Sequence, residues 1–346
     1  MNLREFDLNL LVALDALLTE KNVTHAGHRL NLSQSAMSGA LARLRDFFQD
    51  GLLVVVGRRM VLTPLAEDLV QPVRDVLLQV KGTIATKPHF HPATSDRHFS
   101  IAVSDYMASV LMIDLLRHLK LEAPGVTFEL RALGDRASDD LNRGTLDFVI
   151  APVDEFFTTH HPTEPLFDDV FVCVVWRKNP HVGDTISLEQ YLRLGHVAVR
   201  VVEGAVGNHD EVHLRRLSHT RRIEVLTPTF DLAPPLIVGT DRIATVPARL
   251  ACRYAKFLPI RALPLPVAIP PLREKVQWHR AHDQDPGYLW LRGQLRAAVG
   301  RLEQLPSLVD THKRPRPPAP VHGPQHRRKR LHTSQETIMS RTPVQS

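Results

Sequence analysis

The sequence predicts an α/β fold in which a short helical segment and one long amphipathic helix precede two α/β lobes. Three patterns support this: helical periodicity followed by a hairpin over residues 6–63, an apolar stripe over 64–86, and alternating strands and helices over 97–302. Residues 306–346 are rich in proline and basic side chains and too polar to form a core. We therefore expect a disordered basic tail there.

The composition narrows the class of protein. Hydrophobic residues make up 43% of the chain and charged residues 23%, as in soluble proteins, and no apolar run approaches the roughly 20 residues of a membrane span. The first residues lack a secretory signal pattern. Cys173 and Cys252 have no CxxC spacing, which predicts buried thiols in a reducing compartment. We expect a cytoplasmic protein with no membrane partner.

Charge and motifs exclude other classes. The net charge of +6 lies entirely in residues 306–346, so it does not by itself indicate a nucleic-acid partner for the rest of the chain. The histidines have no acids or cysteines at metal-ligand spacing, so we expect no metal site. GxSxG, Walker, GxGxxG and HExxH motifs are absent. The sequence therefore predicts no catalytic residue and no cofactor.

Three short helices are predicted before residue 50. The first has an apolar stripe formed by Leu8, Leu11, Val12, Leu14 and Leu18. Thr24 is placed to cap the second helix, which ends at Asn31, and Ser33 is placed to cap the third. In the third helix the inward positions, three or four residues apart, are Met37, Leu41, Leu44 and Phe48.

The open face of the third helix carries small polar side chains. Such a face fits the major groove of DNA, because glutamine pairs with adenine and serine bonds to base edges or phosphate; the alternative is a plain solvated face. The run from Leu52 to Leu62 predicts a hairpin whose turn, Gly57-Arg58-Arg59, can lie against phosphates as a wing, and this favours DNA binding. The predicted DNA contacts are Thr24, Ser33, Gln34, Ser35, Ser38, Arg43 and Arg58.

The long helix begins at Thr63-Pro64, with threonine as cap and proline at the first helical position. Its stripe has nearly the spacing of a coiled coil and consists of Leu65, Leu69, Val73, Val76 and Val80. The simplest partner is the same helix of a second subunit, so we expect a homodimer. The alternative is a core helix that packs within one chain.

The third region predicts two lobes with a ligand cleft. Strands near 99–103, 126–133 and 146–150 alternate with helices, which indicates a mainly parallel sheet, and a second set follows from residue 170. Segments near 165–168 and 263–270 are expected to join the lobes. Ligands bind at the carboxyl ends of such strands. The candidate effector-binding residues there are Ser104, Met107, Arg200, Phe230 and Arg249. For Ser104 simple helix capping is the alternative, and for Arg249 the alternative is a surface residue paired with an acid.

These motifs resemble a known family. The segments that carry the resemblance are Leu8-Asn9-Leu10-Leu11, Thr24 to Leu30, Leu32 to Ser38, Leu41 to Leu44, Leu62-Thr63-Pro64, Ala123 to Val126, Leu141 to Asp147, Pro165 to Asp168, Gly239 to Pro247, Asp285-Pro286 and Trp290-Leu291-Arg292. Over residues 1 to about 300 the chain resembles LysR-type transcriptional regulators, and most of all the NodD and NahR subgroup. His25, Gly27 and His28 depart from the strong helix formers usual in that family.

The resemblance implies an α/β protein with an N-terminal all-α winged helix-turn-helix, a long linker helix and a two-lobed, periplasmic-binding-protein-like effector domain. It also implies promoter DNA and RNA polymerase as partners, dimers that pair into tetramers, and activation by a small aromatic acid or phenol. Two alternatives stay open: a LysR-type regulator of a non-aromatic metabolite, and a cytoplasmic solute-binding protein. A solute carrier would have a secretion signal and no helix-turn-helix, and a mobility shift with DNA separates the two classes.

Overall fold

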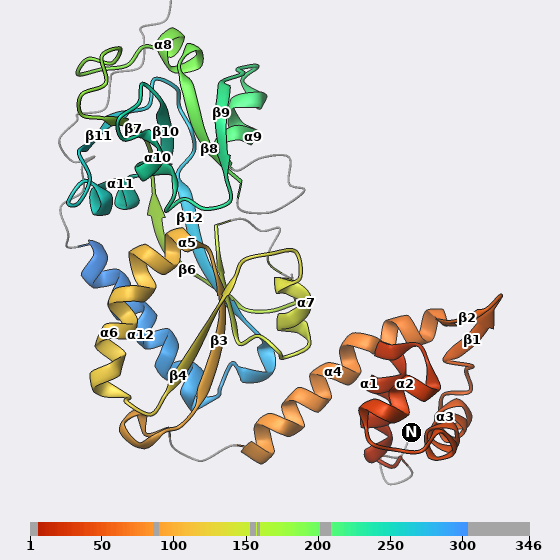
Figure 1. Ribbon diagram of the computed structural model, residues 1–346. Helices are drawn as coiled ribbons and strands as arrows, with labels where there is room; N and C mark the ends of the chain where they lie inside the picture. The colour runs from red at the N-terminus through yellow and green to blue at the C-terminus, as the bar shows by residue number, and fades with distance from the viewer. Residues whose placement is uncertain (1–5, 86–89, 153–156, 158–159, 201–208, 304–346) are drawn as a thin grey trace, which may run out of the picture. The chain divides into compact units, whose positions relative to one another are not determined.

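The computed structural model describes residues 6–85, 90–152, 157, 160–200 and 209–303 (Figure 1). The predicted tail, 306–346, lies outside the described residues. Within the described ranges, no helix combines the length and apolar character needed to cross a membrane.

The N-terminal part is a helical cluster with a hairpin and a long helix, as the sequence predicts. Its elements are α1 (Asn9–Glu20), α2 (Val23–Arg29), α3 (Gln34–Phe48), β1 (Leu53–Val56), β2 (Arg59–Leu62) and α4 (Pro64–Ala85). The two strands pair in antiparallel register, with Val56 opposite Arg59. One apolar cluster joins α1, α2, α3, the base of the hairpin and the first half of α4.

Hydrogen bonds at the helix starts correct one predicted cap. The Ser33 hydroxyl accepts the Ala36 amide at 3.2 Å, as expected for the N-cap of α3. In α2, however, the side chain of Asn22 accepts the His25 amide at 3.0 Å, so Thr24 lies inside the first turn and is not the cap. Asparagine and threonine are both good N-caps, and the sequence alone does not separate two candidates so close together.

The inward face of α1 also differs from the predicted stripe. Leu8 and Val12 are 55% and 43% exposed, whereas the side chains buried in the core are Leu10, Ala13, Leu14, Ala16, Leu17 and Leu18. Apolar residues occupy most of this helix. Its periodicity therefore leaves the buried side undetermined, and the packing of α2, α3 and α4 decides it.

Gly27 explains how α2 and α3 pack closely. A Cβ atom at Gly27 would lie 3.0 Å from the carbonyl oxygen of Leu32, so a larger residue would push the turn away. Asn31 in that turn has φ of 55°, a left-handed conformation that asparagine tolerates. The glycine that weakens helix propensity thus allows the close approach of α2 to the turn in this chain, and a larger residue would need the turn to shift by a few tenths of an ångström.

The apolar stripe of α4 is partly buried within its own chain and partly exposed. Thr63 accepts the Ala66 amide at 3.2 Å, which confirms the predicted cap. Val73 is only 4% exposed and packs into the N-terminal core of its own chain. Leu65, Val76 and Val80 remain 37–44% exposed. The apolar side chains that remain exposed on the stripe therefore do not include Val73.

The effector part contains two five-stranded sheets, which we call lobe I and lobe II. Lobe I comprises β3 (His98–Val103), β4 (Thr127–Ala132), β5 (Phe148–Ala151), β6 (Thr163–Asp169) and β12 (Leu272–Trp278), with α5 (Asp105–Met107), α6 (Ile113–Glu122), α7 (Ala137–Asn142) and α12 (Pro286–Glu303). Lobe II comprises β7 (Phe171–Trp176), β8 (Gly195–Val199), β9 (Arg222–Thr227), β10 (Ile243–Pro247) and β11 (Ile260–Pro264), with α8 (Leu188–Arg193), α9 (His209–Arg216), α10 (Ala233–Ile237) and α11 (Ala248–Tyr254).

Both sheets are mixed, which corrects the expectation of a mainly parallel sheet. Lobe I has the order β4-β3-β5-β12-β6 and lobe II the order β11-β7-β10-β8-β9. In lobe I, β3 pairs parallel with β4 and β5, but β12 pairs antiparallel with β5 and β6. Figure 1 shows α6 and α12 on one face of the lobe I sheet and α7 on the other. The segments predicted to join the lobes therefore include β6, which is itself a sheet strand.

The helix after β3 is interrupted. The sequence predicts one helix from Ser104 to Leu121, but residues Ala108–Met112 form a π-helical segment between α5 and α6. Such segments are rare and often occur at functional sites. This one lies directly after Ser104 and Met107, at the carboxyl end of β3.

Candidate functional site

The exposed face of α3 carries the predicted polar side chains. The open face predicted from the sequence, formed by Gln34, Ser35, Ser38, Ala42 and Arg45, is exposed, as is Arg43, while Met37, Leu41 and Leu44 are buried beneath it. Ser33 and Ser35 lie at the first turn, where their hydroxyls are 2.9 Å apart. Thr24 is exposed on the first turn of α2. A convex helix with small polar groups outward is the shape that enters a major groove.

The hairpin provides a basic turn beside this helix. Gly57 has φ of 63°, a conformation that glycine adopts without strain, and Arg58 and Arg59 follow it with exposed side chains. Arg43 makes a 3.5 Å ion pair with Asp7, with both side chains largely exposed. Its charge is therefore accessible to a phosphate.

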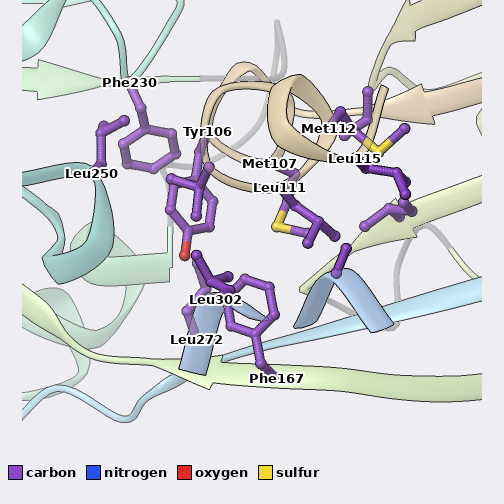
Figure 2. Close-up of a cluster of buried hydrophobic side chains, with 14 of the residues drawn as sticks. Tyr106, Met107, Leu111, Met112, Leu115, Phe167, Phe230, Leu250, Leu272 and Leu302 are labelled. Atoms are coloured by element: carbon purple, nitrogen blue, oxygen red, sulfur yellow. The ribbon is translucent and has the colours of Figure 1, made fainter. Parts of the chain in front are cut away.

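Of the candidate effector-binding residues, Met107, Phe230 and Arg249 lie between the two lobes, beside Ser104. Ser104 is buried, and its hydroxyl accepts the Met107 amide at 3.2 Å, so its observed role is that of a helix cap. Met107 is fully buried, and Phe230 from lobe II packs edge-to-face on Tyr106, with ring centroids 6.2 Å apart. Figure 2 shows these side chains together with Leu250, Leu302 and Phe167. Apolar groups from both lobes thus fill the space between them.

The two predicted arginines lie in different surroundings. The guanidinium of Arg249 donates a hydrogen bond to the carbonyl of Leu302 at 3.2 Å. The same guanidinium lies 5.1 Å from the centre of the Phe167 ring. Its Nε is buried and has no partner among the described residues. Arg200 follows β8 in lobe II, with its amide bonded to Thr227 and its Nε buried without a described partner. Among the described residues, Arg249 rather than Arg200 contacts the interlobe side chains, through Asp169 and Phe167.

Sequence reasoning missed a group of acids at the same place. The Tyr106 hydroxyl donates to Asp169 at 2.7 Å, and the backbone amide of Arg249 donates to the same carboxylate at 3.1 Å. The Asp231 amide of lobe II donates to Asp105 of lobe I at 2.7 Å. Asp105 and Tyr106 directly follow the candidate residue Ser104 in the sequence, and this proximity is a signal by which they could have been predicted as members of the site. Asp169 and Glu274 lie at the crossing of the lobes, which only the tertiary structure reveals.

Glu274 is the most perturbed of these acids. It is 1% exposed, and neither carboxyl oxygen has a hydrogen-bond partner among the described residues. Burial, with a smaller effect of the neighbouring Asp169 charge, raises the pKa of Glu274 from 4.5 to about 8. Burial also raises the pKa values of Asp105 and Asp169. Glu274 is therefore neutral at pH 7 and can donate a hydrogen bond.

No metal is implied by this geometry. Among the described residues, no group of three or more histidine, cysteine or acidic side chains is arranged to hold a metal ion. Cys173 is buried and Cys252 half-buried, and both are free thiols. The polar groups between the lobes are suited to binding and orienting an organic molecule rather than to metal chemistry.

These observations define a class of protein: a helix-turn-helix DNA-binding domain joined to a two-lobed ligand-binding domain. Residues 8–67 match the family model described as bacterial regulatory helix-turn-helix protein, lysR family, and residues 93–300 match the LysR substrate binding domain. The chain belongs to the LysR family of bacterial regulators. It is a DNA-binding transcriptional regulator and not an enzyme.

Individual proteins agree with this assignment. The chain is 44% identical to nodulation protein D 2 of Rhizobium tropici over 292 residues, which cover 84% of this chain and 92% of that protein. A probable transcriptional regulator from Pseudomonas aeruginosa is similar in structure, with a TM-score of 0.57, 31% identity, and coverage of 85% and 98%. The regulatory domain of MexT, described as a transcriptional activator in the same organism, has a TM-score of 0.53 and 25% identity and covers 60% and 100%.

The buried acid predicts a pH dependence of stability. Between pH 4.5 and about 8 the folded chain holds a proton on Glu274 that the unfolded chain has lost, so the free energy of unfolding falls as pH rises through this window. Glu274→Gln stays neutral and should lose this fall. Relative to wild type, the variant should gain about 1 to 4 kcal/mol between pH 5 and pH 8, measured by urea unfolding.

Glu189→Gln is the control, because the Glu189 side chain is 87% exposed. It should leave the pH dependence unchanged. A pH dependence of Glu274→Gln identical to that of wild type would show that Glu274 ionises normally in the folded chain.

Proposed function

We propose that this chain activates transcription by binding promoter DNA through α3 and the wing, in response to a small aromatic molecule bound between lobe I and lobe II. The observation that carries the effector part is the interlobe cluster, in which the Tyr106 and Phe230 rings meet beside hydrogen-bonding acids. A ring gains free energy from burial among apolar groups, and a few polar groups fix its orientation. DNA as the partner places the protein in the cytoplasm.

The charge between the lobes favours one kind of aromatic effector. Three aspartates lie there, Asp105, Asp169 and Asp231, beside the neutral Tyr106, Tyr254 and Glu274, against one guanidinium, that of Arg249. A carboxylate ligand would have to approach these acids, whereas a phenol can donate a hydrogen bond to them. The geometry therefore supports a phenol better than an aromatic acid. A non-aromatic metabolite is the alternative, and the binding experiment below includes it.

Effector binding has to change the arrangement of the lobes. Side chains fill the interlobe space in this structure, since Met107, Tyr106 and Phe230 are at most 7% exposed. A ligand must displace them or separate the lobes. It can alter DNA binding only through different affinities for the two arrangements. We propose that the arrangement selected by the effector is the one that recruits RNA polymerase.

The first prediction concerns DNA reading. Gln34→Ala should cost about 1 to 3 kcal/mol at one base position, because a side chain that pairs with a base edge is lost. Arg58→Ala should weaken all sites alike and reduce the salt dependence, because it removes a phosphate contact. Selection of binding sites from random DNA, followed by titration at several salt concentrations, measures both. An unchanged base preference in Gln34→Ala would exclude it from base reading.

The second prediction concerns the effector. In titration calorimetry, phenolic and flavonoid compounds should bind more tightly than benzoate and salicylate, and sugars or amino acids should not bind. Tyr106→Phe should weaken binding about fivefold or more, because removing its hydroxyl disturbs the hydrogen bond to Asp169. Arg249→Ala, measured by the same calorimetric titration, tests whether the Arg249 guanidinium contributes to ligand affinity.

Tyr191→Phe is the matched control. Tyr191 is also a buried tyrosine with one hydroxyl contact, to Thr245 at 2.7 Å, but it belongs to a separate core cluster in lobe II. Its loss should leave ligand affinity unchanged. Binding of non-aromatic compounds alone would overturn the proposed effector class.

The third prediction concerns assembly. We propose that the part of the α4 stripe that is not fully buried, Leu65, Leu69, Val76 and Val80, pairs with the same helix of a second subunit, and that dimers pair further into tetramers. Val76→Asp or Val80→Asp should place a charge in this seam and weaken dimerisation by tenfold or more in analytical ultracentrifugation. Val12→Asp, at a similarly exposed valine of α1, should not. A wild-type monomer at micromolar concentration would contradict the proposal.

A further inference from the structure

Arg45, in the last turn of α3, makes contacts that no sequence pattern indicates. Its Nε donates to the carbonyl of Gly51 at 2.8 Å, and its Nη2 donates to the carbonyl of Leu53 at 2.6 Å. Leu53 is the first residue of β1. One guanidinium therefore joins the end of the helix to the first strand of the wing. Arg45 is exposed on the open face of α3, so direct contact with a phosphate is the alternative role that the experiment below separates.

The wing has few other contacts that hold it in place. An isolated two-stranded hairpin is marginally stable in water. Leu53 is buried, but the rest of β1, Val54, Val55 and Val56, is 39–70% exposed. The orientation of the hairpin therefore depends on its base.

At that base, the second contact comes from Asp50. Its carboxylate accepts the Leu52 amide and the Thr63 hydroxyl, each at 2.6 Å, and so joins the start of β1 to the start of α4. Leu52 has φ of 54°, an uncommon conformation for a leucine, which surrounding contacts must maintain. Asp50 fixes the two ends of the hairpin to each other. Among the described residues, Arg45 supplies the side-chain hydrogen bonds that join the hairpin to α3, and these add to the apolar contacts of Leu52 and Leu53 in the N-terminal core.

We propose that Arg45 is a positioning residue for DNA binding, which holds the wing on α3 so that Arg58 and the α3 side chains reach the same DNA duplex together. This inference rests on the DNA contacts proposed above for α3 and Arg58. The guanidinium is suited to the task because its N–H groups point in fixed directions from one plane and meet two carbonyl oxygens at once. A lysine ammonium has the same charge but not this geometry.

A double-mutant cycle tests the proposal. The four full-length proteins are wild type, Arg45→Gln, Arg58→Ala and the double variant, and the probe is a duplex that wild type selects from random DNA. Each single variant should weaken binding about tenfold. The double variant should weaken it by about ten- to twentyfold, because Arg58 of a misplaced wing has little contact left to lose.

A fourth variant, Arg45→Lys, separates positioning from direct contact. If Arg45 positions the wing, lysine should behave like glutamine, and the salt dependence of Arg45→Lys should fall as in Arg58→Ala. If Arg45 itself contacts phosphate, lysine should keep wild-type affinity, and this would overturn the proposal. Arg117→Gln, at a 73% exposed arginine of α6, is the control and should bind DNA normally.

The remaining outcomes are also decisive. A hundredfold loss of DNA affinity in the double variant would mean that the two arginines act independently. Wild-type affinity in both Arg45 variants would mean that the Arg45 contact is dispensable. Either result overturns this inference but leaves the proposed function unaffected. No effect of Arg58→Ala would instead refute the proposed wing contact and the inference with it. Circular dichroism and thermal unfolding of each variant identify any loss of folding, and Arg45→Lys provides the test if Arg45→Gln does not fold.

Discussion

The antiparallel pairing of β6 with β12 is the interaction on which the effector domain depends. Leu272 lies opposite Asp169, and Gln277 lies opposite Thr163, although these strands are far apart in the sequence. Because β12 lies between β5 and β6, the lobe I sheet is complete only after the chain has passed through the whole of lobe II and returned. Lobe I therefore cannot form from a continuous segment, and its folding requires a long-range contact.

The same pairing concentrates polar groups where the lobes meet. Asp169 ends β6 and accepts hydrogen bonds from Tyr106 of lobe I and from the backbone of Arg249 in lobe II. Glu274 on β12 is buried nearby, next to an irregularity in the register between Glu274 and Lys275. Such bulges often occur beside functional sites. A ligand that changes the contacts of Asp169 would thus act on both lobes at once, which is what coupling between effector and DNA requires.

The N-terminal domain uses a different balance of interactions. Its core is small, and the close approach at Gly27 and the caps of Ser33 and Thr63 set the helix positions. Outside that core, hydrogen bonds from side chains to the backbone stabilise the wing, because few of its own side chains are buried. α3 is therefore held mainly by apolar burial, whereas the wing is held by the burial of Leu52 and Leu53 at its base together with the hydrogen bonds of Arg45 and Asp50.

The sequence alone was sufficient to predict much of the local structure of this protein. The periodicity of Met37, Leu41 and Leu44, the Thr63-Pro64 start of α4 and the Ser33 cap are local signals, so they predicted the helix-turn-helix and its exposed face correctly. The tertiary structure decided what depends on neighbours distant in sequence: the rotation of α1, the burial of Val73, the insertion of β12 and the meeting of Tyr106, Asp169 and Glu274. The spacing of apolar residues shows that one side of a helix or strand is apolar. Which element covers that side, and which acidic side chain becomes buried away from water, is decided only when the strands and helices pack.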